Sequence, residues 1–228
     1  MSALAHMLET RGIATVALGL VRYQMEQTRP PRGLWTPFQL GRPLGEPEDP
    51  AFQRRVIMQA LRLLERQDGP VILEDFPDDP PGWSDQPGWQ PPNLTPTDDF
   101  AAELAEIHPA WMRAQSRYGR TTVGLSALPP EAWPRLAAAV IAGELPQVPP
   151  HETTALAARF MADDIKALYS EAAQADGPAP ASRQINDWFW SRTAAAQTLR
   201  ALRTTALASD NNALKTVGTR FFVPTPFI

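Results

Sequence analysis

A central stretch rich in proline and acidic residues constrains the fold of this chain more than any other feature. Residues 68–110 contain ten acidic and no basic side chains, and prolines recur through 77–97 so closely that no helix or strand can continue there. The whole chain has 25 prolines among 228 residues, about twice the usual share. We therefore expect two folded parts, 1–76 and 98–228, with 77–97 as an acidic linker or strap between them.

Two tryptophans leave the role of this segment open. Trp83 and Trp89 carry large apolar rings that are better covered than solvated. One interpretation is a flexible acidic connector, and the other is a strap that packs on its own domain or on a neighbouring subunit. We take Trp83 and Trp89 as candidate partner-binding residues.

The pattern before this segment is typical of a small parallel α/β domain. The expected strands are 13–18, 33–38 and 70–73, and the expected helices are 3–10, 20–27 and one that starts at Asp49–Pro50. In this last helix we expect an apolar stripe of Ile57, Ala60, Leu61 and Leu64. Alternation of strand and helix implies parallel pairing with right-handed crossovers. A sheet of three strands is small for an independent domain, and strands from another chain could complete it.

The pattern after the segment predicts an all-α bundle of four or five helices. The expected helices are 100–119, 129–143, 152–173 and 182–208, followed by a short last helix. We expect Pro109 to kink or split the first of them. The apolar tail 223–228 is expected to dock, and its Phe227 and Ile228 are candidate partner-binding residues. The predicted fold class is an α/β N-terminal part followed by an all-α helical bundle with an extended tail, mainly helical overall.

Composition and charge exclude several classes of function. A formal net charge of −4 argues against a nucleic-acid partner, and the longest apolar run, 13–21, is too short to span a membrane. No secretion signal is evident, so we expect a cytoplasmic protein. The absence of cysteine removes disulfides, thiolate metal sites and thiol catalysis. The three histidines lack metal-binding spacing, and we expect neither a metal nor a cofactor.

The remaining catalytic candidates are acid–base groups that form no motif. No serine lies in a G-x-S-x-G elbow, which argues against a serine hydrolase. A stand-alone acid–base enzyme would use a pocket between sheet and bundle. Its proton carriers would come from Asp163, His108, His151 and Tyr169. A further alternative is a structural homo-oligomer whose apolar tail swaps between protomers.

The loop over 38–47 is the most specific feature of the chain. Gly41 and Gly45 permit backbone conformations closed to other residues, and the guanidinium of Arg42 suits a carboxylate or phosphate. The loop follows a strand and precedes a helix, where ligands bind in open parallel sheets. Three interpretations of the loop are open. It is a rigid connection in which Arg42 pairs with Glu46 or Glu48, or it binds an anion or substrate, or it contacts another subunit. We take Arg42, Gly41, Gly45 and Arg32 as candidate substrate-binding residues.

The segment Gly12-Ile13-Ala14-Thr15-Val16, the Pro30-Pro31-Arg32 strand entry and the loop from Pro37 to Gly45 resemble a known family. They are similar to the C-terminal part of the selenoprotein B type subunits of glycine, sarcosine, betaine and D-proline reductases. The resemblance covers roughly residues 10–66. In that family a Gly-Ile-Pro-Thr-Val strand and a Pro-Leu-Gly-x-Pro loop lie downstream of the catalytic selenocysteine or cysteine.

The resemblance implies a reductase-like complex, but this chain lacks the reactive group of the family. Family members cleave a C–N bond reductively with a selenol or thiol, and no residue here can take that role. The resemblance therefore implies a non-redox subunit whose partner chain supplies the cysteine or selenocysteine. The substrate would be a small molecule derived from an amino acid.

Overall fold

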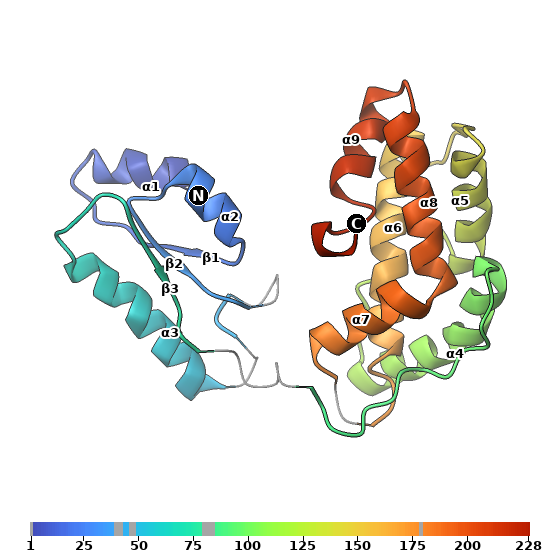
Figure 1. The fold of residues 1–228 in the computed structure, drawn as a ribbon, viewed down its shortest axis with the longest axis horizontal. Helices are drawn as coiled ribbons and strands as arrows, with labels where there is room; N and C mark the ends of the chain where they lie inside the picture. Colours follow the sequence, from blue (N-terminus) through green and yellow to red (C-terminus); the bar gives the residue numbers. More distant parts are fainter. Residues whose placement is uncertain (1, 39–42, 46–48, 79–84, 178–179) are drawn as a thin grey trace. The chain divides into compact units, whose positions relative to one another are not determined.

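A computed structural model describes residues 2–38, 43–45, 49–78, 85–177 and 180–228. The chain forms two compact units, Met1–Ser84 and Asp85–Ile228, which are described separately. Within the described ranges there are nine α-helices and one parallel sheet of three strands. The predicted fold class is confirmed: the chain is mainly helical, and its α/β part comes first (Figure 1).

The sheet of the first unit is short. Its strands are β1 (Ala17–Gly19), β2 (Arg32–Trp35) and β3 (Ile72–Asp75), in the order β1-β2-β3 and all parallel. The first strand begins later than the expected 13–18, and Ile13 is exposed. The reason is that the backbone N–H and hydroxyl of Thr15 donate to the carboxylate of Glu9, so this stretch is held by a side chain instead of a sheet ladder.

Helices cover both faces of this sheet (Figure 1). They are α1 (Ser2–Glu9), α2 (Arg22–Thr28) and α3 (Pro50–Arg62), and α3 continues into a 3₁₀ turn, Leu63–Glu65. Met25 of α2 packs on Gly19 and Gly33, whereas α3 packs on the face that contains Leu34. Because the two crossover helices lie on opposite faces, the connections have opposite hands, and the expectation that both are right-handed is wrong. The two glycines explain how α2 comes so close, since a Cβ on either would overlap Met25.

Helix α3 buries a different stripe from the expected one. Asp49 caps it by accepting from Phe52 N–H at 3.0 Å, with Pro50 in the first turn, as predicted. The buried residues are Phe52, Val56, Ala60 and Leu63. Ile57 and Leu61 are instead 41% and 46% exposed. Both stripes have helical spacing, and the ring contacts of Phe52 with Phe38 and Phe76 fix which one faces the sheet.

The second unit is a helical bundle around α6. Its helices are α4 (Phe100–Tyr118), α5 (Trp133–Ile141), α6 (Thr154–Ala172), α7 (Ser182–Arg192), α8 (Ala194–Ala208) and α9 (Asn212–Arg220). Helix α4 continues through Pro109. The expected helix 182–208 is two helices separated by Thr193, whose backbone is extended. The Thr193 hydroxyl donates to Phe189 O and accepts from Ala196 N–H, so it closes α7 and opens α8.

The tail docks on its own bundle. Phe222 and Val223 are buried, and a 3₁₀ turn, Thr225–Phe227, follows them. The ring of Phe227 stacks on Trp190 with centroids 5.5 Å apart. Ile228 is 63% exposed. None of the helices in the described ranges has the length and apolarity needed to cross a membrane.

Candidate functional site

Gly45 lies at the carboxyl edge of the small sheet, against the first turn of α3. Its φ is +91°, and a Cβ there would lie 2.6 Å from Cε1 of Phe52. Glycine is therefore required by backbone conformation and by packing on the ring. The other two loop candidates, Gly41 and Arg42, lie outside the described residues. Close packing accounts for the glycine at 45 without a ligand.

Arg32 is held inside the first unit. Its Nη1 donates to Glu9 Oε1 at 2.6 Å, which ties β2 to the end of α1. Burial opposes ionisation of Glu9, but hydrogen bonds from Thr15 and Arg32 outweigh it and lower the pKa of Glu9. The guanidinium therefore has an intramolecular carboxylate partner.

The four acid–base candidates do not converge. His108 packs on Trp111, His151 bonds the backbone carbonyl of Ser126, and Tyr169 bonds Glu103. Asp163 pairs with Lys166 at 2.9 Å. In the part of the chain that the structure describes, no hydrogen bond, ion pair or ring contact joins any two of the four. These four candidates thus form no proton-transfer constellation in the described part of the chain.

Ser126, Asp164 and His151 lie close together, but their hydrogen bonds stabilise a loop and do not form a catalytic triad. Asp164 is fully buried and accepts from the backbone N–H groups of Gly124, Leu125 and Ser126 and from the Ser126 hydroxyl. His151 contacts the carbonyl of Ser126, not its hydroxyl. Because the hydroxyl donates to the carboxylate and is itself buried, it cannot act as a nucleophile activated by histidine.

Glu171 holds the same loop two turns further along α6. Its carboxylate accepts from Trp111 Nε1 and from Thr121 and Thr122, all at 2.7–2.8 Å. Sequence reasoning missed both Glu171 and the buried Glu103, because charged residues on helices usually face solvent. For Glu103 a signal existed: it lies among the apolar positions Phe100, Leu104 and Ile107 of one helix.

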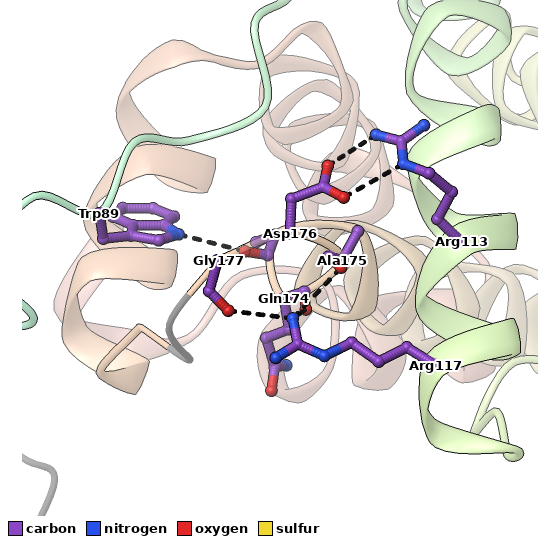
Figure 2. A network of polar contacts seen from close by, with 8 residues as sticks. Trp89, Arg113, Arg117, Gln174, Ala175, Asp176 and Gly177 are labelled. Carbon is purple, nitrogen blue, oxygen red and sulfur yellow. Dashed lines mark hydrogen bonds and ion pairs between the residues drawn. The ribbon is translucent and has the colours of Figure 1, made fainter.

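The C-terminal end of α6 carries a polar network (Figure 2). Arg117 Nη1 donates to the carbonyls of Gln174, Ala175 and Gly177, which follow the C-cap of α6. Beside it, Arg113 makes two hydrogen bonds to Asp176. These bonds lower the pKa of Asp176. The network stabilises the end of α6 and the turn that follows.

Residues 85–97 run along this helix end as a strap. Trp89 packs against the bundle core, and its Nε1 donates to Ala173 O at 3.2 Å (Figure 2). Gln86 and Gln184 exchange hydrogen bonds, which hold the strap to α7. The other strap tryptophan, Trp83, lies outside the described residues.

A cavity of about 310 Å³ lies between the strap, α4 and the end of α6. Its floor is apolar, with Ile107, Ala110 and Ala172, and its rim carries Glu106, Arg113 and Asp176. Arg113 and Asp176 bond each other, while Glu106 accepts from Thr95. The cavity has the size of a small-molecule site, but its charged groups already have partners. Among the described residues no group of three side chains could hold a metal ion.

Comparison of the chain with protein-family models found no match, and neither curated proteins nor solved structures gave one.

Several large apolar side chains of the first unit are exposed. Five of these residues belong to α1, α2 and the segments next to them: Leu4, Met7, Ile13, Val21 and Tyr23. Three more lie on α3: Ile57, Met58 and Leu61. The candidate partner-binding residues taken from the sequence are a different set, in the strap and the tail. Exposed apolar side chains mark a protein–protein interface where they form a contiguous patch.

Proposed function

We propose that this chain is a non-redox subunit of a reductase-like complex that acts on a small substrate derived from an amino acid. A partner chain supplies the reactive thiol or selenol, because this chain has no cysteine. A free thiol or selenol needs a reducing compartment, so we place the complex in the cytoplasm. The reductase part of the proposal comes from the resemblance of residues 10–66 to the selenoprotein B type subunits.

The observation that carries the proposal is the exposed apolar surface on the α1–α2 side of the first unit. Leu4 and Met7 are three residues apart on α1, so they lie on one side of that helix. Tyr23 on α2 exposes a large ring. Burial of such groups against a partner contributes about 25 cal/mol of binding free energy per Å² of apolar surface removed from water.

Purification of the tagged full-length chain from its native host at low salt, with intact-mass analysis of what co-elutes, tests this proposal. The variant Leu4→Ser/Met7→Ser removes two exposed side chains of α1. The matched control, Leu125→Ser/Met112→Ser, changes the same two residue types in the second unit. Met7 and Met112 are 45% and 46% exposed.

The proposal expects a stoichiometric partner that contains cysteine or selenocysteine. This partner should be lost from the α1 variant and retained by the control variant. A chain that elutes alone, or a partner that both variants retain equally, would overturn it. A lone chain whose melting temperature rises with a small ligand would instead support the stand-alone enzyme.

A further inference from the structure

The outer side of α3 carries an ordered stripe of charged and apolar residues. Arg54, Met58, Leu61 and Glu65 follow one another at spacings of four, three and four residues, which keeps them on one side of the helix. All four are exposed, and Ile57 is exposed beside them. The stripe therefore has a cation at one end, a carboxylate at the other and apolar side chains between.

The charges of Arg54 and Glu65 are unpaired among the described residues. Within the ranges that the structure describes, neither Arg54 nor Glu65 has an ion pair or a hydrogen bond through its side chain. Their order also opposes the helix dipole, which favours anions near the N-terminus and cations near the C-terminus. Arg54 lies nearer the N-terminus of α3, and Glu65 lies in the turn that ends it.

An antiparallel copy of the same helix would satisfy both ends. If Met58 of one chain faces Leu61 of the other, Leu61 faces Met58 in return, as a twofold axis requires. In an antiparallel pair, the numbers of two facing residues always have the same sum. Arg54 therefore faces Glu65 at one end of the pair, and Glu65 faces Arg54 at the other. Each charge would also lie near the end of the partner helix whose dipole attracts it.

We propose that α3 is a homodimer interface in which two copies pair antiparallel through Arg54, Met58, Leu61 and Glu65. A single helix pair buries less than the roughly 1,600 Å² of a standard interface. The dimer is therefore in concentration-dependent exchange with the monomer. The contact lies on the opposite face of the sheet from α1 and α2, so it does not rest on the proposed partner surface.

Charge reversal tests the pairing, and sedimentation of the full-length chain over a range of concentrations is the measurement. Arg54→Glu and Glu65→Arg each place like charges opposite one another at both ends of the interface. Each variant alone should dimerise about tenfold or more weakly than the unmodified chain. An equimolar mixture of the two should recover the dimer, because glutamates at both positions of one chain then face arginines of the other.

Arg135→Glu is the matched control, since it makes the same change of charge on α5 and should leave the dimer intact. Circular dichroism checks that each variant keeps its helices. A monomeric unmodified chain at all concentrations would overturn the proposal, and so would single variants that dimerise normally. A mixture that stays monomeric would also overturn it, because the proposed register requires the two variants to complement each other.

Cysteine cross-linking gives a second measurement that does not depend on charge. The chain contains no cysteine, so each introduced thiol is unique. Under oxidation, Met58→Cys mixed with Leu61→Cys should give mainly the mixed disulfide. Cross-links of Met58→Cys with itself in equal or greater yield would contradict the antiparallel register.

Discussion

Tyr169 donates its phenolic hydrogen bond to the carboxylate of Glu103 at 2.7 Å, and both side chains are buried in the bundle. The same carboxylate accepts the backbone N–H groups of Ala194 and Ala195, the first two residues of α8. Three donors and the positive end of a helix therefore replace the water that a buried carboxylate gives up. Glu103 joins α4, α6 and α8 at one point.

Removal of either partner should destabilise the bundle. Tyr169→Phe takes away a hydrogen bond to a charged group, and we expect a loss of about 1.5–3 kcal/mol in the free energy of unfolding. Glu103→Ala leaves three buried donors without an acceptor, and the loss should be larger. Urea unfolding of each variant measures this. Tyr118→Phe is the control, since this side chain is exposed and its hydroxyl, among the described residues, contacts only Gln174 O, at 3.4 Å. Equal losses for Tyr118→Phe and Tyr169→Phe would contradict the prediction.

The same tyrosine makes stability depend on pH. Burial, followed by the charge of Glu103, raises the pKa of Tyr169 well above the ordinary 10.0. Above about pH 10 the unfolded chain releases this proton and the folded chain keeps it, so the folded state binds more protons. The free energy of unfolding should therefore fall as pH rises above about 10, and this contribution is fully present below that pH. Urea unfolding at several alkaline pH values should show the fall in the unmodified chain and in Tyr118→Phe. A fall just as steep in Tyr169→Phe would show that another group causes it.

Sequence reasoning predicted the element types well and their packing less well. Asp49–Pro50 gave the start of α3 correctly, because a cap is a local interaction between neighbouring residues. The stripe of α3 was wrong because two sets of apolar residues have helical spacing, and contacts with Phe38 and Phe76 from distant parts of the chain select one of them. Likewise, an extended Thr193 is stable only because its hydroxyl contacts both flanking helices.

The roles of acidic side chains were the least predictable feature. Asp163 and Asp164 are neighbours with the same side chain, yet the first pairs with Lys166 at the surface and the second is buried under a loop some forty residues away in sequence. A helix rotates by about 100° per residue, so adjacent positions face different surroundings. Which of the two faces the core depends on the packing of α6, which no local pattern encodes.

These two aspartates provide a matched pair of variants. Asp164→Asn keeps the shape of the side chain but replaces one acceptor oxygen by an NH₂ group that faces backbone N–H or hydroxyl donors. We expect a loss of about 2–4 kcal/mol in the free energy of unfolding. Asp163→Asn should cost less than about 1 kcal/mol, because it weakens one partly exposed ion pair. Hydrogen exchange should also become faster at the amides of Gly124, Leu125 and Ser126 in Asp164→Asn alone. Unchanged exchange at these amides would contradict the role given to Asp164.

Trp89 should determine whether the strap stays on the bundle. Its ring packs against the core, and its Nε1–H reaches Ala173 O at the end of α6 (Figure 2). Trp89→Ala removes both contacts. The remaining contacts of residues 85–97 with the bundle include the Gln86–Gln184 hydrogen bonds, the Asp85–Arg183 ion pair, the Thr95–Glu106 hydrogen bonds and the packing of Leu94. We expect residues 85–97 to become sensitive to limited proteolysis and the amide of Gln86 to exchange faster. Trp89→Phe keeps an aromatic ring but loses the donor and part of the apolar surface, so its cleavage rate should lie between the other two. Equal protection of all three proteins would contradict this role of Trp89 and would mean that the other contacts of the strap suffice to hold it in place.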